Sequence, residues 1–237
     1  MPLLVRTWNV FHGNTVPPGR HAFLEQMVRL VTSDDPDVVC LQEVPVWALA
    51  RLGDWSGVTA VGAVAARPRL LSARLGGSVT SLNPGLLRSA LTGQANAMLF
   101  SPRLRVVEQR SFVVSRRADG ERRVCHAVRL ADTGLVANFH VTSAHAGEQL
   151  LRAAAFADGL ALPAEPVLLC GDANLRPGGG GAYEELASWG FSAPLAGIDQ
   201  ILVRGLPIVR VSTWPEERRR LDGRLLSDHA PVEAEVG

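Results

Sequence analysis

Short apolar segments of strand length recur along the whole chain, and polar residues stand at the ends of several of them. Residues 166–169 are apolar and lead into CGDANL, which places Asp172 and Asn174 directly after a predicted strand. Loops at strand ends are where a rigid sheet displays reactive groups. The pattern therefore predicts a strand-rich chain whose chemistry gathers where strands end.

The order of the predicted elements indicates layered α and β structure. Along residues 135–142, apolar side chains alternate with Asn138 and His140, which share the other face of a strand. Many strands with few helices, in mixed order, predict a mainly antiparallel or mixed double sheet with helices outside. Without an internal repeat or a long linker, residues 1–237 are expected to form one domain. The predicted strands are 3–10, 37–42, 95–100, 106–114, 123–130, 135–142, 167–170, 198–203, 208–212 and 231–236, and the predicted helices are 21–33, 148–162 and 182–189.

Composition limits the classes of partner. The chain has 237 residues, 47% of them hydrophobic, which is enough for a sizeable core. The net charge of +1 gives no bulk attraction to nucleic acid. Small basic clusters at residues 116–117, 122–123 and 218–220 are expected to be solvated loops and helix ends.

Cysteine usage and hydropathy predict a cytoplasmic protein. Cys40, Cys125 and Cys170 are odd in number and far apart, which argues against a disulfide framework. The N-terminal residues lack the apolar length of a signal peptide, and no run approaches the ~18 apolar residues of a membrane span. We expect a monomer without a membrane span.

The polar residues at the predicted strand ends favour a metal site if these strand ends lie together at one edge of the sheets. Carboxylate and amide oxygens are hard ligands that suit Mg²⁺ or Mn²⁺, and clustered carboxylates need a cation or a proton to offset their repulsion. A histidine beside a carboxylate suits contact with a phosphate oxygen. The chemistry predicted is metal-assisted hydrolysis of a phosphate ester by water. The residues concerned are Asn9, Gln42, Glu43, Asn138, His140, Asp172, Asn174, Asp199, Asp228 and His229.

Each residue alone also has a purely structural interpretation. Asp172 and Asn174 can form an Asx-turn, and Asp228 can cap a turn before Pro231. His140 can be a satisfied core histidine, and Glu43 can precede a helix. Only the repetition at strand ends favours function.

Six segments in this order carry a resemblance to a known family: RTWNVFHGN, DPDVVCLQEV, NFHVT, VLLCGDANL, GIDQILV and LSDHAPVEAEV. They resemble the endonuclease/exonuclease/phosphatase (DNase I-like) superfamily and span nearly the whole chain, from Arg6 to Val236. The resemblance implies a four-layer α/β sandwich, in which two packed mixed β-sheets are flanked by helices. It also implies a divalent cation, usually Mg²⁺. Glu43 matches the chief metal-binding glutamate, Asn9 matches the asparagine that supports the metal site or its water, and Asp228 matches an aspartate that assists metal binding.

The resemblance also implies catalytic roles. Asp172 matches the aspartate that orients or deprotonates the attacking water, and Asn174 matches its partner. His140 matches the histidine that contacts the phosphate, or acts as an acid, near the leaving group. His229 matches the second histidine on the phosphate side, and Asp199 resembles the aspartate that pairs with it.

Contact with substrate is expected for three further residues: His12, Asn96 and Asn138. His12, in NVFHG, either lines the pocket or is a loop histidine, and both interpretations stay open. Asn96 resembles a polar residue that faces the phosphate in other members. Tyr183, the only tyrosine, lies far from the matched central region, which disfavours a tyrosine-dependent mechanism.

Three functional hypotheses remain. A phosphodiesterase or nuclease is the first, with residues 116–123 as the only candidate for binding a polynucleotide backbone. A phosphomonoesterase, or a sphingomyelinase-like or inositol-phosphatase-like enzyme acting on a small molecule or lipid headgroup, is the alternative. A catalytically silent binding domain is the third, although no core motif residue is lost. A serine hydrolase is disfavoured because Gly-x-Ser-x-Gly is absent, and the glycines at 178–181 lack the following Lys-Ser/Thr of a phosphate-binding loop.

Overall fold

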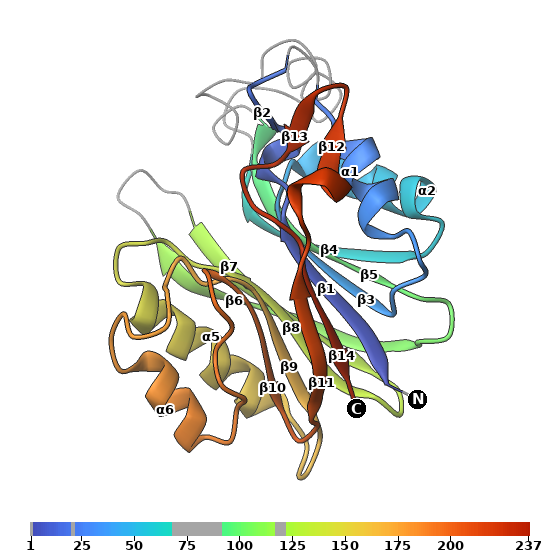
Figure 1. The fold of residues 1–237 in the computed structure, drawn as a ribbon. Coiled ribbons are helices and arrows are strands. Elements are labelled where there is room, and N and C mark those ends of the chain that lie inside the picture. Colours follow the sequence, from blue (N-terminus) through green and yellow to red (C-terminus); the bar gives the residue numbers. More distant parts are fainter. Residues whose placement is uncertain (1, 20–21, 68–91, 117–121) are drawn as a thin grey trace.

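The computed structural model of the chain describes residues 2–19, 22–67, 92–116 and 122–237. Two large sheets face each other, and helices cover their outer faces (Figure 1). In the six-stranded sheet β1 and β3 are parallel, and in the five-stranded sheet β8 and β9 are parallel, while their other neighbours pair antiparallel. The predicted four-layer α/β sandwich with two mixed sheets is thereby confirmed.

The strands of each sheet follow a fixed spatial order. The six-stranded sheet runs β11 (Ile208–Thr213), β14 (Val232–Val236), β1 (Leu3–Asn9), β3 (Val38–Val44), β5 (Gln94–Phe100) and β4 (Thr59–Ala66). The five-stranded sheet runs β10 (Asp199–Arg204), β9 (Val167–Asp172), β8 (Gly134–His140), β7 (Arg122–Leu130) and β6 (Val106–Arg116). A small third sheet contains β12 (Arg220–Leu221), β13 (Arg224–Leu226) and β2 (Thr15–Val16).

Helices lie on both outer faces of the sandwich. Leu24–Val31 (α1) and Leu52–Ser56 (α2) pack on the six-stranded sheet, and Ala146–Leu160 (α5) and Ala182–Ser188 (α6) pack on the five-stranded sheet (Figure 1). The 3₁₀ helices are η1 (Phe11–Gly13), η2 (Val46–Arg51) and η3 (Glu216–Arg219). None of the described helices has the length and apolar character that crossing a lipid bilayer requires.

Apolar cores separate the four layers. Between the sheets, Val38 and Phe100 of one sheet pack with Val136 and Leu168 of the other. On the outer face of the five-stranded sheet, Phe139 joins a second core with the helices, and Trp8 joins a third core on the outer face of the six-stranded sheet. Burial of these side chains supplies the main driving force for stacking the layers.

Strand β8 shows how alternation in the sequence positions polar groups. Its residues Leu135, Ala137 and Phe139 belong to the helix-covered core, as the alternation predicts. Asn138 faces the other sheet, where its Nδ2 donates to the carbonyls of Leu41 (3.0 Å) and Ala97 (2.8 Å). Its Oδ1 accepts a hydrogen bond from Gln42 Nε2 at 2.8 Å. The fully buried side chain thus joins the two sheets.

Several element boundaries differ from the sequence predictions. The strand β4 was not predicted, because its sequence TAVGAVAA is rich in alanine and glycine and poor in the bulky residues that favour strands. Helix α5 begins at Ala146 and ends at Leu160, two residues before the predicted bounds of 148–162. Helix α2 was also not predicted, because five residues are too few to show helical periodicity.

Two expectations about charged and sulfur-containing residues have different outcomes. All three cysteines are buried and free, in line with the absence of a disulfide framework. Arg219, expected to be solvated, is instead buried, and its Nη1 donates to the carbonyls of Leu226, Ser227 and His229. These hydrogen bonds offset the cost of burying its charge. In the basic segment 116–123, residues 117–121 lie outside the described residues.

Candidate active site

Strand register brings polar residues from both sheets to one end of the sandwich. In the parallel pair β8–β9, His140 lies opposite Asp172, and in the antiparallel pair β9–β10, Asp172 lies opposite Asp199. In the other sheet, the parallel pair β1–β3 places Asn9 opposite Gln42, next to Glu43. We call the six residues that converge there the strand-end cluster, namely Asn9, Glu43, His140, Asp172, Asp199 and His229.

Asp172 is the central member of the strand-end cluster. Its Oδ2 accepts a hydrogen bond from Asn9 Nδ2 at 3.0 Å, and its Oδ1 accepts one from the backbone N–H of Asn174 at 2.9 Å. The same Oδ2 lies 3.6 Å from His140 Nε2 and 3.8 Å from His229 Nε2. Burial and the nearby Asp199 carboxylate raise the pKa of Asp172 to about 6. A carboxylate with such a pKa is ionised at neutral pH and can accept a proton.

A break in strand register directs Glu43 toward the cluster. Between the pairs Leu41–Ala97 and Val44–Ala95, strand β3 has two residues, Gln42 and Glu43, where β5 has one. Glu43 occupies this β-bulge with a positive φ of 56°, an uncommon conformation for a residue other than glycine. The bulge directs the two neighbouring side chains to different places. Gln42 bonds to Asn138 and Thr7 in the interior, whereas Glu43 lies near the histidines of the cluster.

Glu43 lies between two histidines. Its Oε1 is 3.8 Å from His140 Nε2, and its Oε2 is 3.6 Å from His12 Nε2. Burial is the main reason that the pKa of Glu43 rises to about 7, which outweighs the opposite effect of the Arg123 charge. A carboxyl group that is costly to ionise without a nearby positive charge suits a cation site.

His12 reaches Glu43 because the chain turns sharply after β1. Phe11, His12 and Gly13 all have positive φ, at 46°, 53° and 81°. Asn9 Oδ1 holds the start of this turn by accepting the backbone N–H of Phe11 at 3.0 Å. His12 is buried beside the cluster, where its Nε2 faces the Glu43 carboxylate.

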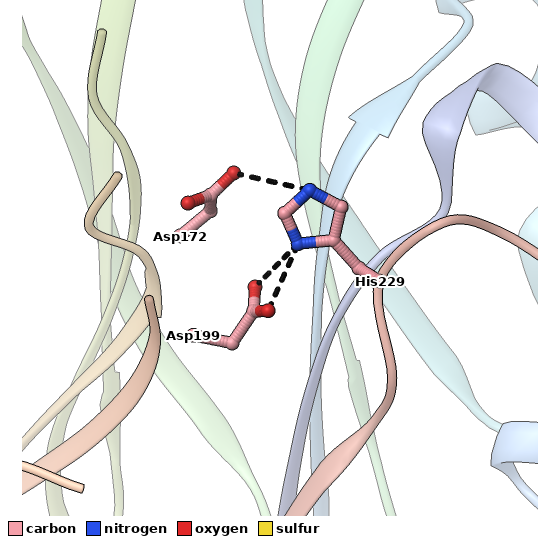
Figure 2. Close-up of side chains that lie close together, drawn as sticks. All are labelled: Asp172, Asp199 and His229. Carbon is pink, nitrogen blue, oxygen red and sulfur yellow. Dashed lines mark hydrogen bonds and ion pairs between the residues drawn. The ribbon is translucent and has the colours of Figure 1, made fainter. Parts of the chain in front are cut away.

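His229 is held between two carboxylates. Figure 2 shows its imidazole ring turned toward Asp199 through Nδ1 and toward Asp172 through Nε2. The Nδ1 atom is 2.8 Å from Asp199 Oδ2 and 3.1 Å from Asp199 Oδ1. Burial disfavours the charged ring, but the hydrogen bond to Asp199 and the carboxylates of Asp172 and Asp228 raise the pKa of His229 to about 9. The ring therefore carries a positive charge at neutral pH.

The loop that presents His229 is fixed by bonds to neighbouring elements. Trp8 Nε1 donates to the carbonyl of His229 at 2.9 Å, and Ser227 Oγ donates to the carbonyl of Asn9 at 2.7 Å. The buried Arg219 donates to the same His229 carbonyl at 3.0 Å. The position of His229 thus depends on β1 and on the segment before β12.

His140 has the opposite surroundings to His229. Its Nδ1 faces Gln94 Nε2 at 3.0 Å and Arg123 Nη1 at 3.3 Å. Burial lowers the pKa of His140 well below its ordinary value, and the charges of Arg123, His229 and His12 lower it further. His140 is therefore neutral at pH 7.

The remaining sequence-predicted residues lie outside the strand-end cluster. Asn174 flanks it: its backbone N–H binds Asp172, and its Nδ2 donates to the carbonyl of Val141 at 2.9 Å. Asn96 is buried, and its Nδ2 donates to the carbonyls of Val124 and Asn138, so it links the sheets as Asn138 does. Asp228 is exposed, and its Oδ1 lies 3.4 Å from Ser227 Oγ, which donates its one hydrogen to the carbonyl of Asn9 instead.

Three residues of this region were not predicted as site residues. Gln94 and Arg123 contact His140, and Ser227 fixes the loop before β14. The motif GQAN contains Gln94, and the pair at 122–123 contains Arg123, but only the stacking of the two sheets shows which histidine they meet. Ser227 precedes Asp228 and His229 directly, and that adjacency was the available signal.

A tight backbone contact fixes the strand that ends in Asp172. Gly171 has a φ of 149°, and a Cβ at this position would lie 1.9 Å from the carbonyl oxygen of Phe139. Only glycine allows β9 to approach β8 this closely. The glycine in Gly-Asp-x-Asn is therefore required by the position of the aspartate.

The donor set fits a hard divalent cation. Glu43 and Asn9 offer carboxylate and amide oxygens. Asp172, Asp199 and His229 also place ligand atoms within 4.8 Å of one another. The second group suits a cation less well, because His229 carries a positive charge and its Nδ1 is bonded to Asp199. Glu43 and Asn9 are therefore the residues of the cluster whose oxygens could best hold a cation. No described contact joins Asp228 to these two residues.

Comparison with known families agrees with this geometry. The model of the endonuclease/exonuclease/phosphatase family matches residues 7–229. The chain belongs to this family. The match covers every member of the strand-end cluster, and the family resemblance expected from the six sequence segments is confirmed. No curated protein sequence matches the chain.

Solved structures of the endonuclease/exonuclease/phosphatase family share the fold at low sequence identity. An endonuclease/exonuclease/phosphatase from Beutenbergia cavernae superposes with a TM-score of 0.72 at 16% identity, covering 99% of this chain and 71% of that one. A mannosyl-6-phosphatase from Bacteroides thetaiotaomicron gives 0.68 at 17% identity, with 99% of both chains covered. TDP2 from Caenorhabditis elegans gives 0.63 at 17% identity, covering 100% of this chain and 74% of that one. At these identities the similarity concerns the fold alone.

Proposed function

We propose that the chain is a divalent-metal-dependent hydrolase of phosphate esters, acting as a phosphodiesterase or nuclease through attack by a water molecule. The observation that carries the proposal is the environment of Asp172 Oδ2. This one oxygen accepts a hydrogen bond from Asn9 and lies within 3.8 Å of the Nε2 atoms of both His140 and His229. A proton acceptor and two imidazole donors thus face the same small space.

Asp172 is proposed to orient the attacking water and to take its proton. Two hydrogen bonds, from Asn9 and from the backbone of Asn174, hold both of its carboxylate oxygens in place. A fixed general base contributes roughly 10²–10⁴-fold to a hydrolysis rate. Asn174 keeps its own position through the carbonyl of Val141.

His229 is proposed to stabilise the negative charge that develops on the phosphoryl and leaving oxygens. Its positive charge is held by Asp199, so the ring does not need to gain a proton during the reaction. A charged donor placed in advance stabilises the transition state more than the ground state.

Glu43 and Asn9 are proposed to hold the divalent cation, with Mg²⁺ or Mn²⁺ as the ions that fit their oxygens. When bound, such an ion polarises a phosphoryl oxygen and offsets the charge of the leaving group. Glu43 is the residue whose ionisation most needs a cation, because burial raises its pKa. Asp228 adds negative charge near His229, from the exposed side of the loop.

A phosphomonoesterase is the second candidate, and two observations favour it. The net charge of +1 gives little attraction for a polynucleotide backbone. The match covers 99% of the mannosyl-6-phosphatase chain but 74% of the longer TDP2 chain, so this chain is closer in length to the monoesterase.

A substrate panel tests both candidates. The purified chain is assayed on bis(p-nitrophenyl) phosphate, p-nitrophenyl phosphate, sugar phosphates and single- and double-stranded DNA, with Mg²⁺ or Mn²⁺ and with EDTA. Hydrolysis that EDTA abolishes supports the proposal, and a preference for diesters or monoesters decides between the candidates. A rate that persists in EDTA, or no hydrolysis of any ester, contradicts it.

A further inference from the structure

His140 is surrounded on its Nδ1 side by hydrogen-bond donors. Gln94, a buried residue of β5 in the six-stranded sheet, places Nε2 at 3.0 Å from this atom. Arg123, on β7 in the five-stranded sheet, places Nη1 at 3.3 Å from it. Residues of both sheets therefore converge on one ring nitrogen, on the side opposite to the carboxylates.

The guanidinium of Arg123 determines whether Nδ1 of His140 donates or accepts a hydrogen bond. An arginine side chain can donate hydrogen bonds but cannot accept them, so Nδ1 must present a lone pair to Arg123. Gln94 then fits only with its amide nitrogen toward the ring, because its oxygen would meet the same lone pair. A neutral imidazole that accepts at Nδ1 carries its hydrogen on Nε2.

We propose that Gln94 and Arg123 are positioning residues that keep the hydrogen of His140 on Nε2 and direct this N–H into the strand-end cluster. The proposal rests on the proposed phosphoesterase function for its consequence in catalysis. Nε2 lies 3.6 Å from Asp172 Oδ2 and 3.8 Å from Glu43 Oε1, both too long for a direct hydrogen bond. The N–H is therefore available to an oxygen of the substrate or of the attacking water.

The two histidines consequently act in different forms. Asp199 accepts from Nδ1 of His229, which favours a protonated ring, whereas Gln94 and Arg123 donate to Nδ1 of His140, which favours a neutral ring. His229 supplies positive charge, and His140 supplies a neutral donor with a fixed direction. Two charged rings beside Asp172 would repel each other.

The direct test is the ¹⁵N NMR spectrum of the purified full chain labelled at histidine, recorded at pH 7 with and without Mg²⁺. His140 is assigned by comparison with His140→Gln. We expect the chemical shifts of a neutral ring protonated at Nε2. A hydrogen on Nδ1, or a doubly protonated ring, overturns the proposal, and this measurement requires neither a positioning variant nor activity.

A pair of variants tests the catalytic consequence. Gln94→Glu replaces the donor with an acceptor and is expected to move a hydrogen of His140 onto Nδ1 and to lower kcat about 100-fold, with a smaller change in KM. The matched control is Gln109→Glu, because exposed Gln109 places Oε1 3.2 Å from His126 Nε2, outside the site. The control should leave the signals of His140 and kcat unchanged. A folded Gln94→Glu variant with unchanged signals and kcat overturns the positioning role.

The failures of the two proposals are distinguishable. If the wild-type chain hydrolyses no phosphate ester but His140 carries its hydrogen on Nε2, the proposed function fails and the assignment of the hydrogen stands. If the chain is active and the hydrogen is on Nδ1, the proposed function stands and the positioning role fails.

Discussion

Asp199 and His229 form the best-defined polar pair of the site, with Nδ1 of the histidine 2.8 Å from one carboxylate oxygen and 3.1 Å from the other. The pair joins the first residue of β10 to the loop that precedes β14, two segments 30 residues apart in the chain. It sets both the orientation and the charge of the ring. Loss of the carboxylate should therefore affect catalysis more than folding.

The first prediction concerns this pair. Asp199→Asn keeps the shape of the side chain but removes the charge that holds His229 protonated. We expect kcat to fall about 100-fold, since a preorganised charged donor contributes roughly that much. Steady-state kinetics on the best ester of the panel provide the measurement. Asp158→Asn, at an exposed residue paired with Arg204 far from the cluster, is the control and should retain full activity. Equal rates for the two variants would contradict the role of Asp199.

The second prediction concerns the cation. For the wild-type chain, Mn²⁺ or Mg²⁺ at about 100 times its Kd should stabilise the folded state by about 2.7 kcal/mol. Glu43→Gln removes the carboxylate that is costliest to ionise without a cation, and this variant should lose most of that stabilisation. Thermal unfolding with and without metal measures the difference. Glu216→Gln, an exposed residue that pairs with Arg220, should respond to metal as the wild type does. A full metal response in Glu43→Gln would move the cation to other ligands.

The third prediction concerns the backbone beside Asp172. Gly171→Ala places a methyl group 1.9 Å from the carbonyl oxygen of Phe139, so β8 and β9 must separate. We expect a loss of at least about 3 kcal/mol in the free energy of unfolding. Urea denaturation measures it. Gly159→Ala is the matched control, because a Cβ there meets nothing within 4 Å inside helix α5, and it should gain about 0.5 kcal/mol. Similar stability for the two alanine variants would show that the strands tolerate the methyl group.

The fourth prediction concerns pH and stability. Burial lowers the pKa of His126 from 6.5 to about 4. An unfolded histidine binds a proton near pH 6.5, whereas the folded one binds it only near pH 4, so falling pH favours the unfolded state within this window. The stability lost is about 3 kcal/mol, and the loss ends below pH 4.

His126→Gln should remove this part of the pH dependence. Urea denaturation at pH 7 and pH 4.5 measures it for the wild type and the variant. His145→Asn, at an exposed histidine, should retain the wild-type dependence. Identical pH dependence in wild type and His126→Gln would mean that folding does not lower the pKa of His126.

The sequence predicted which polar residues lie at strand ends better than it predicted the contacts between their side chains. Asp172, His140 and Asp199 follow from apolar runs that stop at polar residues, and the observed strands end or begin at these residues. Gln94 and Arg123 could not be linked to His140, because they come from β5 and β7 and only the stacking of two sheets brings them to one nitrogen.

Asn138 illustrates a second limit. Alternation correctly put it on the same strand face as His140, from which contact with substrate was expected. That face meets the other sheet, so the side chain of Asn138 bonds to Leu41, Ala97 and Gln42 within the protein. Periodicity distinguishes the two faces of a strand. It does not indicate which residues of one face are buried between the sheets and which belong to the site.

The five-stranded sheet is built from one uninterrupted stretch of chain, between β6 and β10, and the six-stranded sheet from the segments on either side of it. His140, Asp172 and Asp199 therefore belong to the inserted stretch, whereas Asn9, Glu43 and His229 belong to the flanks. Neither portion contains a complete set of reacting groups. Any ester cleavage would therefore report that the inserted stretch and both flanks have docked.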